Sequence, residues 1–505
     1  MPLYDRPATP IRQLSDHVGE TVALRGWLYN KRGSKGLQFL VLRDGSGLVQ
    51  CVVNAEGVGD ESFAAAEGAS QEASLEVVGL VKEDARQVGG VEVQAERVTL
   101  IGASEDYPIS PKAHGTDFLF NNRHLHLRSL RPWATLRVRS RIIQSIHAYF
   151  LEDGFVQMDA PILTGNAVEG TSTLFELDYF DEPAYLTQSG QLHGEAMAMA
   201  FGKIYTFGPT FRAEKSRTRR HLTEFWMIEP EMAFYDLEMN MGVAEGLLAR
   251  IARDVMEHCK PELEALGRDA GLLEATAAGD FPRISYSDAV ELLTSDKTQL
   301  MLDAEIEGLE DEKHALTEEK DANRAAYGQA TKGEKRRIDS RELEINARLD
   351  EIAEHLRNLP KWKESAAAFE WGADFGGSDE TVLTRHFDRP IIVHRYPAAV
   401  KAFYMKRDPE DDRLALGMDV LAPEGYGEVI GGGERATDLD FLKQQVAAHG
   451  LPESAFDWYF DLRRYGSVPH AGFGLGLERT VAWMCGLQHV RETIPFPRTL
   501  GRLSP

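Results

Sequence analysis

The stretch from residue 211 to residue 234, FRAEKSRTRRHLTEFWMIEPEMAF, places the strongest constraint on how this chain can fold. Apolar, strand-like runs lie on either side of a short loop, which is typical of an antiparallel hairpin. The basic side chains of the loop are those of Arg212, Lys215, Arg217, Arg219, Arg220 and His221. Because arginine offers charged, bidentate donors to phosphate oxygens, one interpretation is a polyphosphate site between the two strands. A solvated charged hairpin is the alternative.

A second stretch, residues 471–484, reads AGFGLGLERTVAWM. Its alternating glycines predict a strand whose backbone can approach a ligand closely, with Arg479 where the strand becomes a helix. Such glycines alone often mark only a tightly packed strand. The two stretches together, however, resemble motifs 2 and 3 of the class II aminoacyl-tRNA synthetases. The segments FRAE, RRHLTEFWMIEPE and GFGLGLER are most similar to those of the asparaginyl members of the aspartyl, asparaginyl and lysyl subgroup.

This resemblance covers nearly the whole chain except one insertion. It implies an N-terminal OB-fold β-barrel followed by an α/β catalytic domain with a central antiparallel sheet, in a cytoplasmic homodimer. The implied reaction is the ATP- and Mg²⁺-dependent ligation of asparagine to tRNA(Asn) through an asparaginyl-adenylate, with release of AMP and pyrophosphate. The sequence contains no Walker loop or Rossmann fingerprint, which agrees with a different type of ATP site.

Composition and charge limit the class of protein. The 505 residues are 43% hydrophobic and 27% charged, which is ordinary for a soluble globular protein. We expect no membrane span and no secretory signal, because long apolar runs are missing and MPLYDRPATPIRQL lacks the signal pattern. Cys51, Cys259 and Cys485 form neither a disulfide framework nor a metal-ligand pattern, which fits a reducing cytoplasm. The net charge of −24 argues against indiscriminate nucleic-acid binding but allows a tRNA on a local basic surface.

Residues 1–103 are predicted to form the barrel. Five strand-like runs alternate with glycine turns, and a helical segment, ESFAAAEGA, separates the third run from the fourth. This order is typical of an OB fold, which commonly presents one face to single-stranded nucleic acid; a small barrel without a ligand is the alternative. The resemblance implies an anticodon reader in which Phe39 stacks on the central base, Gln50 hydrogen-bonds it, and Arg25 contacts a phosphate or base.

Residues 104–131 are predicted to be a linker, and residues 132–505 the catalytic domain. From Trp133 apolar residues recur near the helical period, and the strand-like DGFVQMDAPIL follows. The resemblance makes this unit motif 1, the dimer interface of class II synthetases, although an ordinary amphipathic helix on a sheet has the same pattern. Residues 296–367 depart from the family pattern. Their charge-dense runs with 3/4 apolar spacing predict an antiparallel helical hairpin, either a structural spacer or a contact for tRNA or another protein.

The resemblance assigns catalytic roles to two arginines. Arg212 would hold the α-phosphate of ATP and Arg479 the γ-phosphate, while Phe225 would stack on adenine. The other implied ATP contacts are Glu214, Arg220, His221 and Glu428. Asp419 and Glu428 would ligate Mg²⁺, a hard cation that prefers oxygen ligands. The attack of the amino-acid carboxylate on the α-phosphorus needs alignment and charge neutralisation, so we expect no covalent enzyme intermediate.

The resemblance also implies an amino-acid site. Glu169 would belong to a glycine-bearing loop that closes over the substrate. Ser189 and Gln191 would contact the α-amino and α-carboxylate groups, and Glu229 would pair with the substrate ammonium.

The position of Gly194 bears most directly on the choice of amino acid. Aspartyl enzymes carry a lysine there, and in this chain Gly194 is followed by Glu195. Loss of the cation and gain of a carboxylate disfavour an anionic substrate and offer an acceptor for an amide NH₂. Arg435 would donate to the side-chain oxygen. The alternative is that Glu195 merely begins a helix.

Three other functions stay open on the sequence. An aspartyl-tRNA synthetase would share the fold and the ATP site, but Gly194 and Glu195 argue against it. A synthetase-like asparagine synthetase would amidate aspartate without tRNA, and it would not need a barrel with Phe39 and Gln50. A non-catalytic RNA-binding paralogue would not need intact phosphate- and metal-binding residues.

Overall fold

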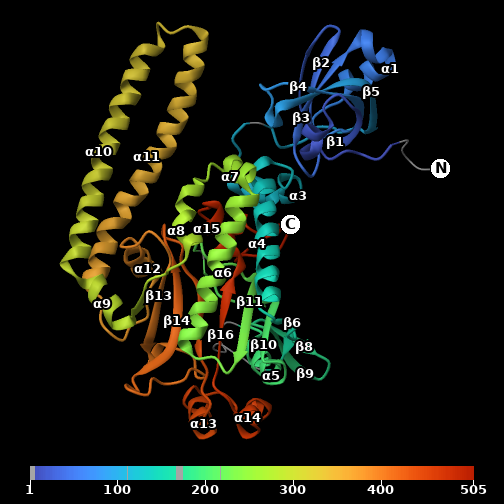
Figure 1. Cartoon of the computed structure of the whole chain (residues 1–505). Helices are drawn as coiled ribbons and strands as arrows, with labels where there is room; N and C mark the ends of the chain where they lie inside the picture. Colours follow the sequence, from blue (N-terminus) through green and yellow to red (C-terminus); the bar gives the residue numbers. More distant parts are fainter. Residues whose placement is uncertain (1–5, 111, 166–173, 217) are drawn as a thin grey trace. The chain divides into compact units, whose positions relative to one another are not determined.

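The computed structural model of the chain describes residues 6–110, 112–165, 174–216 and 218–505 (Figure 1). Contacts within the chain divide it into one unit that ends at Leu119 and a second from Phe120 to Pro505. The segment 104–131, predicted to be a linker, is therefore shared between the two units. Within the described residues, no helix is both long and apolar enough to cross a membrane.

The first unit contains a closed five-stranded barrel in the order β1-β2-β3-β5-β4, which confirms the predicted OB fold. Its strands are β1 (Thr21–Ser34), β2 (Leu37–Arg43), β3 (Leu48–Asn54), β4 (Ser74–Glu83) and β5 (Val91–Gly102). The predicted helix is α1 (Ala55–Gly68), between β3 and β4. Because side chains alternate along a strand, Leu40 and Leu42 fill the barrel while Phe39 lies on its outer face.

The second unit is built on an eight-stranded sheet in the order β12-β13-β14-β15-β16-β11-β10-β6. Pairing is antiparallel from β13 to β10, as predicted, and the edge strands β12 and β6 run parallel to their neighbours. The strands are β6 (Val156–Met158), β10 (Lys203–Phe211), β11 (Glu224–Ala233), β12 (Arg283–Ser285), β13 (Ile391–Pro397), β14 (Leu414–Ala422), β15 (Gly427–Glu434) and β16 (His470–Gly476). β6 stops before Pro161, the predicted end of this strand, because its pairing with β10 extends only to Met158.

Three helices cover one face of this sheet: α4 (Leu130–Glu152), α6 (Leu237–His258) and α15 (Leu477–Cys485). Ile228 and Met232 of β11 belong to the core beneath them. Because side chains alternate along a strand, Met227, Glu229 and Glu231 face away from these helices and line cavities on the other side. On β16 the same alternation places glycines at 472, 474 and 476, so from residue 472 onward this strand has no side chains on the face opposite the helices.

The remaining elements border this framework. The shorter helices are α2 (Thr116–Asn121), α3 (Arg123–His126), α5 (Gln191–Phe201), α7 (Lys260–Leu266), α8 (Glu274–Ala278), α9 (Tyr286–Thr294), α12 (Gly377–Thr384), α13 (Leu439–Ala448) and α14 (Asp457–Arg464). A small sheet has the order β7-β9-β8, with β7 (Leu163–Thr164), β8 (Glu176–Tyr179) and β9 (Glu182–Leu186).

The predicted helical hairpin is present as α10 (Asp296–Tyr327) and α11 (Lys332–Ala367), two long helices side by side (Figure 1). The buried side chains of α11 recur every seven residues, at Ile345, Ile352, Leu359 and Ala366. A sevenfold repeat is the pattern of a coiled-coil seam. The base of the hairpin packs against α9 and α12, so the insertion is anchored in the catalytic domain.

Candidate active site

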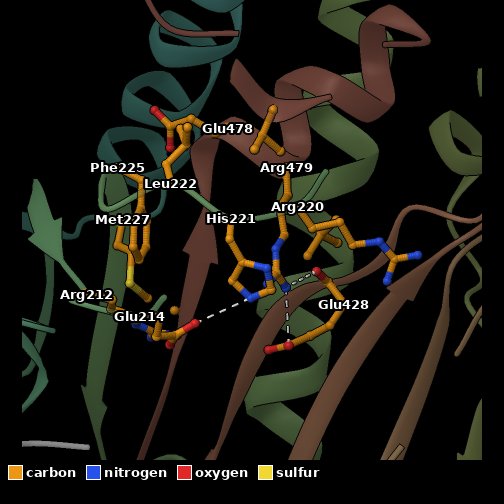
Figure 2. Close-up of a pocket in the computed structure, with 14 residues that line it drawn as sticks. Arg212, Glu214, Arg220, His221, Leu222, Phe225, Met227, Glu428, Glu478 and Arg479 are labelled. Carbon is orange, nitrogen blue, oxygen red and sulfur yellow. Dashed lines mark hydrogen bonds and ion pairs between the residues drawn. The ribbon is translucent and has the colours of Figure 1, made fainter. Parts of the chain in front are cut away.

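The seven predicted ATP contacts line a single cavity of about 100 Å³ on the face of the sheet opposite α4 and α6. They are Arg212, Glu214, Arg220, His221, Phe225, Glu428 and Arg479. Figure 2 draws them as sticks, with Arg479 directed toward Glu428 and His221 toward Glu214. Residues more than 250 positions apart in the sequence are thus brought to one site by the pairing of β15 and β11 with β16.

Arg212 and Phe225 form one wall of this cavity. Arg212 follows the last residue of β10, and its amide donates a hydrogen bond of 3.1 Å to the carbonyl of Thr223 across the hairpin. Its guanidinium carbon lies 5.4 Å from the centre of the Phe225 ring. The cation and the aromatic face therefore lie side by side at the end of the β10–β11 hairpin.

Arg479 lies in the first turn of α15, opposite Glu428 of β15. Its guanidinium donates to the Glu428 carbonyl at 2.8 Å and to the Glu428 carboxylate at 3.3 Å. Burial alone would raise the pKa of Glu428, but Arg479, Lys401 and Arg212 together lower it, so the carboxylate is ionised at neutral pH. This side of the cavity thus holds an anchored arginine and a fixed negative charge.

Arg220 and His221 come from the basic loop between β10 and β11. Arg220 donates to the Glu380 carboxylate at 3.0 Å, to the Thr381 hydroxyl at 3.1 Å, and to the Gly425 carbonyl. His221 lies 3.6 Å from the Glu214 carboxylate. Burial, together with the positive charge of Arg479, lowers the pKa of His221, so its imidazole is neutral at pH 7.

A larger cavity of about 630 Å³ adjoins the first and shares Arg212, Met227, Glu428 and Gly474 with it. Four predicted amino-acid contacts line it: Ser189, Gln191, Glu229 and Arg435. The Glu229 carboxylate accepts hydrogen bonds from the Ser189 hydroxyl, from the Gly190 amide at 2.9 Å and from the Thr206 hydroxyl at 3.2 Å. These donors fix a carboxylate on the cavity wall.

The sequence prediction missed Glu231, which also lines this cavity. Its carboxylate accepts from the Arg435 guanidinium at 2.5 Å, and both side chains are at least 98% buried. Burial raises the pKa of Glu231 against the opposing effect of Arg435, and the neighbouring Glu195 raises it further. The two-residue spacing of Glu229 and Glu231 in the strand-like MIEPE run places both on one face, and that signal could have identified Glu231.

Glu195 is fully buried and is not among the residues that line the cavity. Its carboxylate accepts from Tyr459 at 2.8 Å, from Arg463 at 2.8 Å and from Gln191 at 3.1 Å, and it lies 2.9 Å from His470. Burial alone would raise its pKa, but Arg463, His470 and Arg435 lower it. The predicted amide acceptor is therefore engaged by protein groups behind the cavity wall.

The lack of a side chain at Gly194 leaves room for Glu231. A Cβ atom at this position would lie 3.2 Å from Cγ of Glu231 and 3.6 Å from Cδ1 of Ile204. A longer side chain on this turn of α5 would extend against the Glu231 carboxylate. Gly194 and Glu231 thus form one structural unit, although they are far apart in the sequence.

Asp419 and Glu428, the predicted Mg²⁺ ligands, face one another across Gly431. A Cβ atom at Gly431 would lie 2.6 Å from Oε1 of Glu428 and 3.3 Å from Oδ1 of Asp419. Asp419 also accepts from Lys401 Nζ at 2.6 Å. Within the described ranges, no group of three or more His, Cys, Asp or Glu side chains is arranged to hold a metal ion. A cation between the two carboxylates would therefore need further oxygen ligands from a bound substrate.

In the barrel, Phe39 and Gln50 lie together with Arg32, which the sequence prediction missed. The Arg32 guanidinium carbon lies 5.2 Å from the centre of the Phe39 ring, and Nη2 of Arg32 donates to the Gln50 carboxamide oxygen at 3.0 Å. Arg25 is not part of this group, because its guanidinium donates to Glu76 at 2.8 Å and to the Arg6 carbonyl at 2.6 Å. Glu169, the predicted lid residue, lies outside the described residues.

Comparison with known proteins agrees with this geometry. Residues 115–500 match the family described as tRNA synthetases class II (D, K and N), and residues 22–101 match a family described as an OB-fold nucleic acid binding domain. The chain is 53% identical over 504 residues to an asparagine–tRNA ligase of Sorangium cellulosum, with 100% of both chains covered. It belongs to the asparaginyl-tRNA synthetase family.

Other members of this family are similarly close. The asparagine–tRNA ligase of Thermus thermophilus is 46% identical over 497 residues, which cover 98% of this chain and 99% of that protein. The crystal structure of asparaginyl-tRNA synthetase from Pyrococcus horikoshii, complexed with asparaginyl-adenylate, has a TM-score of 0.81 and 38% identity and covers 99% of this chain and 100% of that chain. The fold of the family's catalytic domain therefore extends over the whole second unit of this chain.

Proposed function

We infer that this chain is an asparagine–tRNA ligase, which uses ATP to attach asparagine to tRNA(Asn) through an asparaginyl-adenylate and releases AMP and pyrophosphate. The buried Arg435–Glu231 pair on the wall of the amino-acid cavity carries this inference. A carboxamide donates through its NH₂ group and accepts through its oxygen, so it complements a carboxylate beside a guanidinium. A substrate carboxylate would meet Glu231 as a like charge, which disfavours aspartate.

The backbone groups of the amino acid have their own partners in this proposal. Glu229, fixed by three hydrogen-bond donors, pairs with the substrate ammonium. Ser189 and Gln191 line the same cavity and contact the α-amino and α-carboxylate groups. Glu169 belongs, in this proposal, to a loop that closes over the bound amino acid.

Glu195 acts in this proposal as a positioning residue, and the role of amide acceptor passes to Glu231. The hydrogen bond of 3.1 Å from Gln191 Nε2 to Glu195 fixes the orientation of a carboxamide on the cavity wall. Arg463, Tyr459 and His470 hold Glu195 in turn. A satisfied buried network of this kind keeps a polar side chain in one conformation.

The first chemical step depends on alignment and charge. The asparagine carboxylate attacks the α-phosphorus of ATP, and the bond to pyrophosphate breaks. Arg212, at the junction of the two cavities, neutralises the α-phosphate, while Arg479 binds the γ-phosphate and Phe225 stacks on adenine. Glu214, Arg220 and neutral His221 complete the ATP contacts.

We also propose that Asp419 and Glu428 hold Mg²⁺ when ATP is bound. The two carboxylates face a common space across Gly431, where a Cβ atom would come as close as 2.6 Å to Glu428. Two carboxylates leave most of the coordination sphere to phosphate oxygens and water, as is usual for Mg²⁺. The bound cation would neutralise the charge of the departing pyrophosphate.

The barrel supplies the anticodon reader in this proposal. Phe39 is an aromatic face on the outside of β2, and Gln50 offers a carboxamide beside it. Base stacking accepts any base, so base identity requires hydrogen-bonding groups such as Gln50. Arg32 adds a cation next to both residues, whereas Arg25 would first have to release Glu76.

A cytoplasmic homodimer completes the proposal. Four large apolar side chains between the end of α4 and β7 are at least 39% exposed: Leu151, Val156, Ile162 and Leu163. Val156 belongs to β6, the edge strand of the central sheet, and such an edge can be covered by a second copy. The three cysteines are buried as free thiols, which fits a reducing compartment.

The proposed function is tested by charging assays. The enzyme, ATP and Mg²⁺ are incubated with a tRNA(Asn) transcript and either labelled asparagine or labelled aspartate, and the esterified amino acid is identified after hydrolysis. We expect esterified asparagine and almost no esterified aspartate. Aspartate on the tRNA would instead indicate an aspartyl enzyme, and free asparagine formed from aspartate and ammonia would indicate an asparagine synthetase.

A further inference from the structure

Lys401 lies directly at the pair of carboxylates proposed to hold Mg²⁺, and the mechanism above does not use it. Its Nζ is 2.6 Å from Oδ2 of Asp419, and both side chains are at least 85% buried. Lys401 follows the short turn after β13, and its stem crosses β14 at Gly417, where a Cβ atom would lie 3.5 Å from the Lys401 side chain. Because Gly417 has no side chain, the Lys401 stem passes close to the β14 backbone and its ammonium reaches Asp419.

The ammonium is surrounded by groups that favour a cation. It lies 3.8 Å from the centre of the Tyr396 ring, a cation–π distance. Asp374 and Glu428 line the same cavity as Lys401 and Asp419, so the ammonium is surrounded by carboxylates. The position next to Asp419 is thus already occupied by a positive charge in the chain without substrates.

We propose that Lys401 is an internal counter-ion that takes the place of a divalent cation at Asp419 until ATP brings the metal. The inference rests on the proposed Mg²⁺ site and adds to it a residue that controls when the site can be filled. In the absence of ATP, Lys401 neutralises Asp419 and competes with free metal. When ATP and the metal bind together, the phosphate oxygens supply the additional negative charge, and Lys401 releases Asp419.

Geometry and electrostatics indicate that Lys401 and a divalent cation compete for Asp419 rather than bind it together. Lys401 Nζ lies 2.6 Å from Oδ2 of Asp419, and Oδ1 of the same carboxylate faces Glu428 across Gly431, so a divalent cation between the two carboxylates would share Asp419 with Lys401. Two cations on one carboxylate repel each other strongly in a partly buried site. Lysine also suits a displaceable role, because its flexible four-carbon stem allows the ammonium to move while the backbone stays in place.

The test measures metal binding directly, without turnover. Mn²⁺ is titrated at pH 8 into the full-length enzyme with and without a non-hydrolysable ATP analogue, and free Mn²⁺ is followed by electron paramagnetic resonance. The variants are Lys401→Met, which removes the charge, and Lys401→Arg, which keeps it. Lys406→Met is the matched control, because Lys406 pairs with Glu434 and does not line the cavity. Lys401→Gln replaces Lys401→Met if the latter does not fold.

We expect wild type, Lys401→Arg and Lys406→Met to bind Mn²⁺ weakly alone and tightly with the ATP analogue. Lys401→Met is expected to bind Mn²⁺ alone with a Kd about tenfold lower than wild type. Unchanged or weaker Mn²⁺ binding by Lys401→Met would overturn the counter-ion inference while leaving the Mg²⁺ site intact. Failure of wild type to bind Mn²⁺ even with the ATP analogue would overturn the metal site and the inference together.

Discussion

Glu231 is the residue on which amino-acid selection depends most directly in the proposed function. It faces the cavity beside Glu229, accepts from Arg435, and touches the position of Gly194. In this proposal each of these neighbours has a different part in selection: Glu229 binds the substrate ammonium, Arg435 donates to the amide oxygen, and Gly194 leaves space for Glu231.

The first prediction concerns Glu231→Gln. This change keeps the size of the side chain but replaces a charged acceptor by a carboxamide that can also donate to a substrate carboxylate. Because hydrogen bonds to charged groups contribute about 1.5–3 kcal/mol, we expect kcat/KM for asparagine in ATP–pyrophosphate exchange to fall by about 10- to 100-fold. The ratio of asparagine to aspartate activity should fall as well. Glu434→Gln is the control, because Glu434 is also buried and pairs with Lys406 outside the cavity. An unchanged ratio in Glu231→Gln would contradict the assignment.

The second prediction concerns Glu380, which holds Arg220 at 3.0 Å. Burial and the neighbouring Glu428 raise the pKa of Glu380 from 4.5 to about 7. The folded chain therefore binds this proton more tightly than the unfolded chain, and stability is lost as pH rises from about 4.5 through 7. Above pH 7 the full cost is about 3 kcal/mol.

Glu380→Gln removes this cost and keeps an acceptor for Arg220. We expect the Tm of the ligand-free variant to exceed that of wild type by a few degrees at pH 8, and the difference to be less than half as large at pH 5.5. Differential scanning calorimetry at both pH values measures this. A variant that is less stable than wild type at pH 8 would show that Glu380 is ionised without cost in the fold.

The site residues that lie within recognisable sequence motifs could be predicted. The residues that tertiary packing brings to the site from distant segments could not. All seven predicted ATP contacts line one cavity; the motif 2 and motif 3 stretches carry six of them as local patterns, and Glu428 belongs to the separate family segment that ends in GGGER. The acceptor role given to Glu195 depended on sequence position alone, and Glu195 lies behind the wall because Arg463 and His470 approach it from a distant segment. No local pattern in the sequence indicates that contact. The same holds for Lys401, whose meeting with Asp419 depends on the pairing of β13 with β14.

The longest helical element of the chain is the hairpin α10–α11, which touches the basic loop between β10 and β11. The guanidinium of Arg219, next to Arg220, lies 2.7 Å from the carboxylate of Glu354 on α11. A cavity of about 500 Å³ between α11 and this loop is lined by Arg219, Glu354 and also by Arg220 and Arg479. The hairpin therefore braces the loop that carries four of the predicted ATP contacts: Arg212, Glu214, Arg220 and His221.

The third prediction tests this brace with Glu354→Ala. Loss of the ion pair gives the loop more freedom, and an exposed ion pair contributes about 0.2–1 kcal/mol, so we expect KM for ATP to rise by about two- to fivefold. Arg341→Ala is the matched control, because it breaks an equally exposed pair with Glu319 within the hairpin, away from the ATP cavity. Equal KM values for ATP in wild type and Glu354→Ala would show that the ion pair between Arg219 and Glu354 does not affect ATP binding.

At the scale of elements, periodicity predicted the hairpin well because its helices are long and pack mainly on each other. The apolar spacing of α11 is a local property of the sequence, so both helices could be placed between residues 296 and 367. The contact between Glu354 and the loop could not be predicted, since it depends on the angle at which the hairpin leaves the sheet.

The whole molecule separates two tasks into two units: the barrel carries the proposed anticodon contacts, and the second unit contains both cavities. The fourth prediction follows from this separation. We expect Phe39→Ala to lower kcat/KM for tRNA(Asn) charging by about 10- to 100-fold, because a stacked base is worth about 1–3 kcal/mol. ATP–pyrophosphate exchange without tRNA should be unchanged, since no cavity residue is altered. A parallel loss of exchange would show that the barrel variant damages the catalytic domain.

The proposed function depends most on the claim that the amino-acid cavity selects an amide and rejects a carboxylate. The most direct measurement is amino-acid-dependent ATP–pyrophosphate exchange with asparagine and with aspartate, for wild type and Gly194→Lys. We predict strong exchange with asparagine and little with aspartate in wild type. Gly194→Lys should lose asparagine exchange by about 100-fold, because the new ammonium would lie against the Glu231 carboxylate. Strong aspartate-dependent exchange by wild type would contradict the claim.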